Sequence, residues 1–337
     1  MADVINNLAT VQQNNVKRVE FWAKKLEAII RIEKSNFVFT SLGKEVNLPR
    51  KQGTTTYSTK RPNRLPISAT GALTPLVEGV PPVALKVEFQ KTQTAINQYG
   101  NYIIETDVVD AVAFDDVKKV YQPELAMVAA EEVETVVMNS FADASERFVN
   151  SRANADAIIA TDVLTLAEGR LATLTMRNAF RKGHSKYGGK FVGVVHTNVM
   201  QDLLEDATLL DNILTPGNEN SPMKNGTLNS YEVYGMYYQE TLMCPRVANA
   251  TGINVYTSVF LGKDAYHVIK FGDLEWKQTG FEATKDDPLG QKATLGYKQW
   301  IGAKVVDPLA ITLVYSASAF DDAGYTTEPL SAAADQS

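Results

Sequence analysis

The sequence has 337 residues, of which 45% are hydrophobic and 21% charged, with a formal net charge of −6. These values are ordinary for globular proteins and allow one large domain or two average ones. The single cysteine, Cys244, excludes an internal disulfide, and no apolar run is long enough to predict a transmembrane helix. Because the first residues also lack the regions of a signal peptide, we expect a protein made in a cytoplasm, with no membrane partner.

Charge is divided unevenly along the chain. Residues 1–64 carry 12 of the 33 basic residues but 5 of the 39 acidic ones, and the last nineteen residues carry acids and no base. A basic arm on an acidic body favours contact with another copy or with nucleic acid, although a solvated N-terminus explains the charge equally well.

The first predicted elements are a helix and a projecting hairpin. Residues 14–34 have the apolar spacing of an amphipathic helix that includes Trp22. The threonine-rich residues 54–59 favour a strand. Alternation over Leu85–Phe89 then predicts a strand with one buried face. We interpret the segment between these strands as the tip of a long hairpin.

Proline dominates this tip, the stretch "STKRPNRLPISATGALTPLVEGVPP" over residues 58–82. It holds five of the thirteen prolines, begins with three bases and has one acid, Glu78. Proline prevents a helix or a central strand, and a loop of this length is usually functional or disordered. The candidate contact residues here are Lys60, Arg61, Arg64, Leu65, Ile67, Leu73, Leu76 and Val77.

A long helix and an α/β region follow. Pro123 is expected to begin a helix that ends at Phe148 and spans roughly 39 Å, with Val133, Val137 and Phe141 in its apolar stripe. Residues 161–183 predict a second helix, capped by Thr161 or Asp162 and stopped by Gly183. Residues 190–197 predict a buried strand, and residues 198–206 predict a short helix capped by Thr197. Residues 293–318 predict two antiparallel strands joined at Asp307-Pro308.

The sequence contains no motif that supports catalysis. It has no phosphate-binding glycine loop and no zinc-protease motif. The three histidines lie far apart, so each is better explained by packing or capping than by metal binding. An enzyme is therefore unsupported, with no catalytic, cofactor-binding or metal-binding residue predicted, although a triad assembled in space would leave no such pattern.

Four stretches, in this order, resemble the coat proteins of the N-four-like tailed phages. They are "TPLVEGVPP" (74–82), "NQYGNYIIETDVVD" (97–110), "LGKDAYHVIKFG" (261–272) and "DPLGQKATLGYKQWIGAKVVDPLAITLVYSAS" (287–318). The resemblance covers the chain from about residue 40 to 318 and implies an α+β fold, the Hong Kong ninety-seven type of phage coat protein.

The resemblance also implies a role for each segment. Expected are an N-arm (1–43), an E-loop (44–96), a peripheral domain with its spine helix (97–159), an axial domain (160–285), return strands of the peripheral domain (286–320) and an acidic tail (321–337). The implied function is that of a major capsid protein in the virion, assembled in the host cytoplasm.

The implied partners are other copies of the chain in hexamers and pentamers, a portal protein, a scaffold, a cement protein and packaged double-stranded DNA. Three alternatives remain open at this point. They are an encapsulin-like nanocompartment, a soluble α/β enzyme without a recognisable motif, and a DNA-binding protein that acts through the basic arm.

Overall fold

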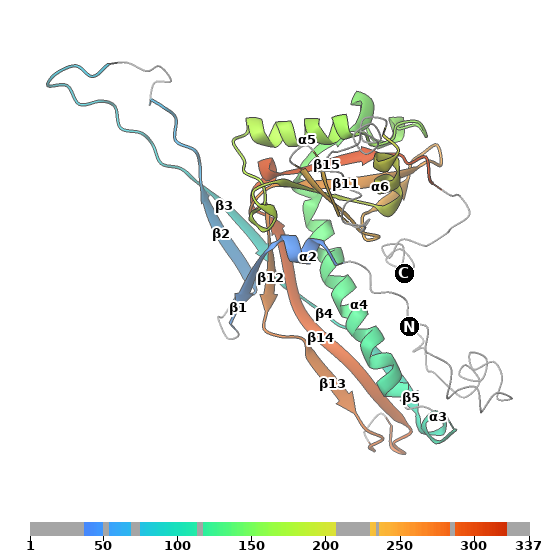
Figure 1. Ribbon diagram of the computed structural model, residues 1–337. Helices are drawn as coiled ribbons and strands as arrows, with labels where there is room; N and C mark the ends of the chain where they lie inside the picture. Colours follow the sequence, from blue (N-terminus) through green and yellow to red (C-terminus); the bar gives the residue numbers. More distant parts are fainter. Residues whose placement is uncertain are drawn as a thin grey trace.

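The computed structural model describes residues 37–49, 54–68, 75–112, 117–206, 230–233, 236–283 and 287–321. The helix predicted over 14–34 with its Trp22, the contact residue Leu73 and the acidic tail from residue 322 lie outside these ranges. Within them, helices and strands form two large sheets, a long helix and a separate two-stranded hairpin (Figure 1). No helix among the described residues is long and apolar enough to cross a membrane.

The long strand β14 (Lys292–Val305) organises a six-stranded sheet. Its first half pairs with β13 (Glu275–Thr279) and β5 (Tyr102–Thr106), and its second half pairs with β12 (Tyr266–Phe271) and β4 (Asn97–Tyr99). Strand β1 (Lys44–Leu48) adds to β12 in parallel. The short helices α2 (Phe39–Leu42) and α3 (Asp107–Val112) precede β1 and follow β5.

Helix α4 (Val117–Asn139) runs along β14 as the long axis of this layer (Figure 1). Its 23 residues correspond to roughly 35 Å at the rise of an α-helix. Leu125 and Ala129 pack on Leu295 and Tyr297 of β14. Val133, Val137 and, just beyond the helix, Phe141 enter the largest hydrophobic core, which joins the two sheets.

The bounds predicted for this helix were wrong at both ends. Pro123 is the seventh residue of α4, beyond the first turn, so its missing N–H removes one helical hydrogen bond, and the helix continues through it. The helix ends at Asn139, and a 3₁₀ turn (Ser140–Asp143) leads into strand β6 (Ser145–Phe148). Because β6 pairs in parallel with β15 (Ile311–Ser316), the neighbouring strand supplies its backbone partners in place of a further helical turn.

The second sheet has seven strands in the order β6-β15-β11-β7-β9-β8, with β10 added to β11. The remaining members are β7 (Phe191–Val195), β8 (Ser230–Val233), β9 (Met236–Glu240), β10 (Arg246–Ala248) and β11 (Asn254–Leu261). Helices α5 (Leu166–Asn178) and α6 (Thr197–Leu204) lie beside it (Figure 1). The buried strand predicted at 190–197 is confirmed as β7, all of whose residues are buried.

Both helix caps predicted in this region were wrong. The Thr165 side chain caps α5, while Asp162 accepts hydrogen bonds from Arg152 and Asn150 instead. Helix α5 also ends at Asn178, before Gly183. The cap of α6 is His196, whose imidazole accepts the Asn198 N–H at 3.2 Å.

The two C-terminal strands exist, but the prediction that they pair with each other was wrong. Strand β14 lies in the six-stranded sheet, whereas β15 lies between β6 and β11 in the seven-stranded sheet. A 3₁₀ turn at Pro308–Ala310, capped by Asp307, separates them. A reversal of the chain at Asp307-Pro308 is compatible with two strands of one hairpin or with two strands of different sheets. Here the packing of each strand on its own partners places them in different sheets.

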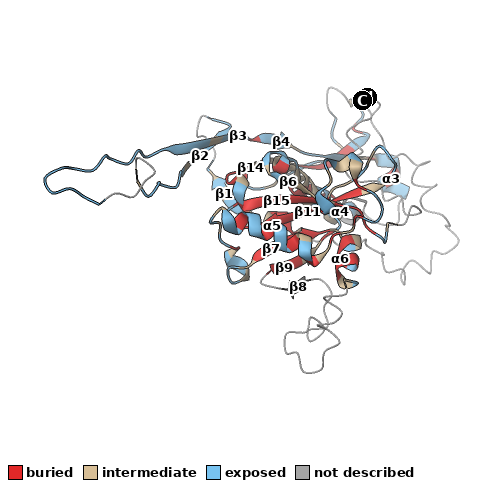
Figure 2. Ribbon diagram, turned by 90° about the horizontal axis from the view of Figure 1, so that it is seen from above, coloured by how far each residue is buried: buried red, intermediate tan, exposed pale blue. Residues whose placement is uncertain are grey.

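The projecting hairpin consists of β2 (Thr56–Pro62) and β3 (Phe89–Ala95), paired in antiparallel register (Figure 2). The predicted hairpin is thus confirmed, but the buried face predicted for Leu85–Phe89 is not. Strand β3 begins only at Phe89, and the side chains of Leu85, Val87 and Phe89 are exposed. The alternating sequence places Leu85, Val87 and Phe89 on one apolar face, and the rest of the chain does not bury this face.

The two sheets cut across the ranges predicted for the peripheral and axial domains. Strand β6 from the range 97–159 and β15 from 286–320 join the seven-stranded sheet, and β12 and β13 from 160–285 join the six-stranded sheet. The division of the chain into those two domains stays a prediction.

Candidate assembly interface

The hairpin tip presents apolar side chains to solvent. Ile67 is 82% exposed and Leu76 is 76% exposed, far more than an apolar side chain needs for folding. Other large apolar residues of the same segment are also exposed, namely Leu65, Val77, Val80, Val83, Leu85, Val87 and Phe89. Contiguous exposed apolar surface marks sites of interaction. These side chains therefore do not pack on their own chain.

The base of the projecting tip, where β2 ends, is held by an ion-pair junction at Asp307. Arg61 of β2 and Arg181, which follows α5, each pair with one oxygen of this carboxylate, the latter at 2.6 Å. Asp307 itself is 8% exposed and lies in the crossover between the two sheets. One buried carboxylate thus joins the hairpin, the end of α5 and the crossover. Both contacts are ion pairs without hydrogen-bond geometry at the two arginine nitrogens, so the attraction between the charges holds the junction.

Two aromatic contacts add to this junction. The Tyr57 hydroxyl lies 2.9 Å from Nδ1 of His267 on β12. The guanidinium of Arg64 lies 3.8 Å from the centre of the Phe180 ring, a cation–π distance. His267 is buried, and burial together with the nearby Lys44 lowers its pKa, so the ring is neutral at pH 7. Tyr57 on β2 and Arg64 just beyond it thus add two contacts between the hairpin and the rest of the chain.

A second set of contacts, centred on Glu134, holds the short helix α2 against α4. Glu134 of α4 is fully buried and accepts the N–H groups of Phe39 and Thr40 at 3.0 and 2.7 Å. The Tyr266 hydroxyl donates to the Phe39 carbonyl. These contacts satisfy the first N–H groups of α2, which a helix start leaves unpaired. Burial raises the pKa of Glu134 above its ordinary value.

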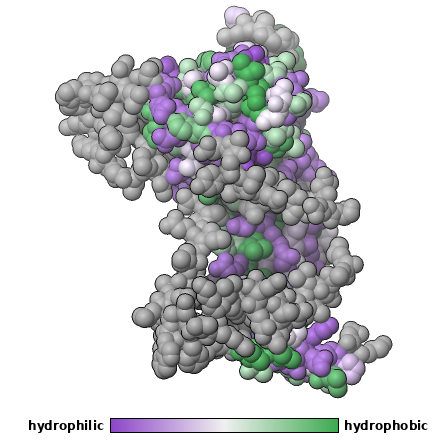
Figure 3. Space-filling view, turned by 90° about the vertical axis from the view of Figure 1, so that its right-hand side faces the viewer, coloured by the Kyte–Doolittle hydropathy of each residue, from purple (hydrophilic) through white to green (hydrophobic). Residues whose placement is uncertain are grey.

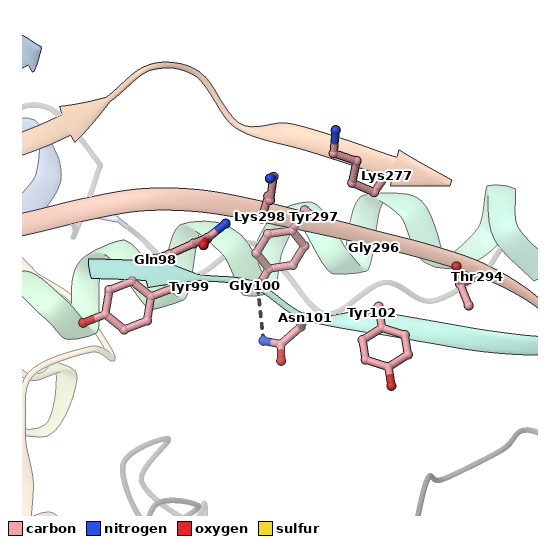
Figure 4. Close-up of a pocket in the computed structure, with 10 residues that line it drawn as sticks. All are labelled: Gln98, Tyr99, Gly100, Asn101, Tyr102, Lys277, Thr294, Gly296, Tyr297 and Lys298. Carbon is pink, nitrogen blue, oxygen red and sulfur yellow. Dashed lines mark hydrogen bonds between the residues drawn. The ribbon is translucent and has the colours of Figure 1, made fainter. Parts of the chain in front are cut away.

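A shallow groove lies where β4 gives way to β5 along β14 (Figure 4). Its volume is about 490 Å³, and its walls include Tyr99, Asn101, Tyr297 and Lys298. The Asn101 amide donates to the Tyr297 hydroxyl at 3.2 Å (Figure 4). The groove is open and holds no pair of groups placed as acid and base. Its form suits contact with a macromolecule better than enclosure of a substrate.

Apolar side chains also reach the surface at the end of the molecule where α3 lies. Val108 and Val112 of α3 and Leu289 are exposed. Figure 3 shows hydrophobic residues gathered at this lower end, next to hydrophilic ones. This end lies far from the hairpin tip (Figure 1), so exposed apolar surface occurs at two distant places of the subunit.

The residues predicted from sequence fall into three groups. Leu65, Ile67, Leu76 and Val77 are exposed at the tip, and Lys60 is exposed on β2. Arg61 and Arg64 instead contact their own chain, at Asp307 and Phe180. The assignment of all these residues to a subunit interface stays a prediction. Trp22 and Leu73, assigned to the same interface, lie outside the described residues.

Sequence reasoning missed Asp307, Glu134, Tyr57 and His267. The sequence marked Asp307 only as the join between two strands, and the structure adds that its carboxylate accepts the Leu309 N–H at 3.2 Å. The ion pairs themselves join residues more than a hundred positions apart, so no local pattern reveals them.

Groups of side chains suited to a metal ion are absent among the described residues. Cys244 is buried, and burial raises the pKa of its thiol well above the ordinary range. The protonated thiol is a poor nucleophile. His184 and His196 cap short helical segments, one of the two structural roles, packing or capping, that the sequence predicted for them.

Of the comparisons with known proteins, only the one with solved structures finds proteins similar to this chain. No protein-family model matches this sequence, and no curated protein matches it. Solved structures do match. The capsid of Ralstonia phage GP4 has a TM-score of 0.65 at 12% identity, covering 88% of this chain and 94% of that chain.

Two further matches show the same likeness. The cyanophage Pam1 capsid has a TM-score of 0.64 at 14% identity, with 95% of this chain and 100% of that chain covered. The head of Helicobacter pylori bacteriophage KHP40 has a TM-score of 0.64 at 11% identity, covering 86% and 94%. The chain therefore has the α+β Hong Kong ninety-seven type fold, as its sequence resemblance implied.

Proposed function

We propose that this chain is the major capsid protein of a tailed phage, which assembles into the icosahedral shell around double-stranded DNA. The observation that carries the proposal is the projecting hairpin, whose base is fixed to the subunit and whose apolar tip has no cover of its own. The whole-length similarity to phage capsid structures supports it.

In this proposal the hairpin is the E-loop and acts as a clasp on a neighbouring copy. Its apolar residues are the anchors, because buried apolar side chains contribute most of the energy of an interface. The proline-rich tip loses less conformational entropy when it becomes ordered on that neighbour. Helix α4 is the stiff spine, and residues 1–43 form a second clasp.

The remaining roles follow from the same proposal. The protein acts as a structural component without enzymatic activity, located in the virion and assembled in the host cytoplasm. Copies form hexamers and pentamers by repeated heterologous contacts. A portal protein completes the shell, and a scaffold and a cement protein are candidate partners.

The direct test is electron microscopy of the particles that the full chain forms after expression alone. Closed icosahedral shells or capsomer rings support the proposal. A monodisperse monomer whose hairpin tip resists protease contradicts it, because a tip that is protected in the monomer needs no neighbour.

Cargo separates the capsid from an encapsulin-like nanocompartment of the same fold. Native particles that contain double-stranded DNA and a portal complex support the capsid. Particles that contain an enzyme in place of nucleic acid favour the nanocompartment.

A further inference from the structure

The seven-stranded sheet has two ends that the strand directions define. Strands β7, β9 and β15 run in one direction, and β11 runs in the other. The segments before β7 and β15 and after β11 therefore lie at one end. The segments after β7, β9 and β15 and before β11 lie at the opposite end.

Helix α5 runs between the same two ends. Asp206, which follows α6, accepts the N–H of Leu166 at the start of α5. Arg181, which follows α5, pairs with Asp307 just before β15. The N-terminus of α5 thus belongs to the second end and its C-terminus to the first.

The first end is basic. Residues 177–190 contain five basic residues and no acid, namely Arg177, Arg181, Lys182, Lys186 and Lys190. Lys263 adjoins them, since its N–H donates to the Lys182 carbonyl at 2.9 Å. Of the two acids in the adjoining segments 262–265 and 306–310, Asp307 is already paired with two arginines.

This basic end also carries exposed apolar surface. The side chains of Lys182 and Lys186 are exposed, and so are those of Leu174 and Phe180. Arg64 of the hairpin lies over the Phe180 ring. Protein–protein interfaces have this composition, in which a few apolar anchor residues are surrounded by a polar rim.

The second end is acidic. The segments 150–165, 196–206, 240–253 and 317–321 contain two basic residues and seven acids, namely Asp156, Asp162, Asp202, Glu205, Asp206, Glu240 and Asp321. Asp321 is fixed there by the Tyr256 hydroxyl at 2.8 Å and by the Asn254 amide.

We propose that the basic end of this sheet in one copy contacts the acidic end of the sheet in the next copy. The inference rests on the proposed self-assembly and names one of its contacts. A contact between two different patches of the same chain is heterologous, and it closes a ring when its rotation closes. Complementary charge favours this head-to-tail order and rejects contact between like ends.

Charge reversal of each end tests the contact in the full chain. One variant carries Lys182→Glu and Lys186→Glu, and a second carries Asp156→Lys and Glu205→Lys. All four side chains are exposed, so both variants are expected to fold. Each variant alone presents like charges across the contact, and its assembled fraction is expected to fall at least about tenfold at low salt.

Two combinations make the test specific. An equal mixture of the two variants restores the contact only in alternating order, so it forms even-numbered rings and no pentamers. A chain that carries all four substitutions has both ends reversed and is expected to close pentamers and hexamers again. A merely structural defect would not be repaired by adding further substitutions.

A control variant carries Lys44→Glu and Lys292→Glu, two exposed lysines on the six-stranded sheet that lie outside the groove. It has the same change of net charge as the variant with Lys182→Glu and Lys186→Glu, and it is expected to assemble as the unmodified chain does. The inference is overturned if the two end variants assemble like this control, or if neither combination restores rings. If the unmodified chain forms no particle, the proposed function fails and not this contact alone.

Discussion

The Asp307 junction gives the sharpest prediction about how the hairpin is held. Asp307→Asn keeps the shape of the side chain and its capping oxygen but removes the charge between Arg61 and Arg181. Breaking a fully buried pair costs about 3–5 kcal/mol. Both arginine side chains remain about a quarter exposed, at 23% and 27%, so water compensates part of the loss. We expect a destabilisation of about 2–3 kcal/mol after this screening.

Thermal unfolding of an unassembled form measures this change. A protein of this size shifts by roughly 2 °C per kcal/mol, so the expected decrease in Tm is about 4–6 °C. Limited proteolysis at low enzyme concentration is expected to cut the hairpin of the variant faster, because its base opens more often.

A double-mutant cycle with Arg61→Met separates the ion pair from other effects of the substitution. Arg61→Met removes the charge and keeps the apolar stem, so the two changes should couple by at least about 1 kcal/mol. A Tm within 1 °C of the unmodified protein would refute the reasoning, and so would energies that simply add. Either result would mean that the hairpin is held by β12 and Phe180 alone.

Three further predictions concern the clasp and the anchors. The double substitution Ile67→Asp and Leu76→Asp should leave the Tm of the free subunit unchanged, since both side chains are exposed. It should abolish shell assembly in electron micrographs, and retained assembly would exclude the tip as a clasp. Tyr57→Phe should remove the His267 contact, cost about 1 kcal/mol and loosen the hairpin toward protease. Because burial raises the pKa of Glu134, its contribution to stability is fully present below pH 4.5 and decreases as pH rises through the higher folded-state pKa. The Tm difference between the unmodified protein and Glu134→Gln should therefore shrink across that window, and a pH-independent difference would contradict this.

The sequence predicted those features that depend on local chemistry. Threonine content placed β2, and five prolines excluded a helix after it, whereas the alternation over Leu85–Phe89 predicted a strand that begins only at Phe89. The continuous apolar run Phe191–Val195 predicted a strand buried on both faces. A packing or capping role was predicted for the isolated histidines, although the cap of α6 was assigned to Thr197 and not to His196. In each of these cases the deciding interactions lie within a few residues.

The tertiary structure alone decided what joins distant parts of the chain. It placed β14 and β15 in different sheets, because the partners of each strand are chosen by packing and not by the turn between them. It ended α4 at Asn139, because β15 offered backbone partners to residues 145–148. It brought Arg61 and Arg181 to Asp307 across more than a hundred residues. It also showed that the apolar tip is uncovered, since only the arrangement of the whole subunit shows which apolar residues are left without a neighbour.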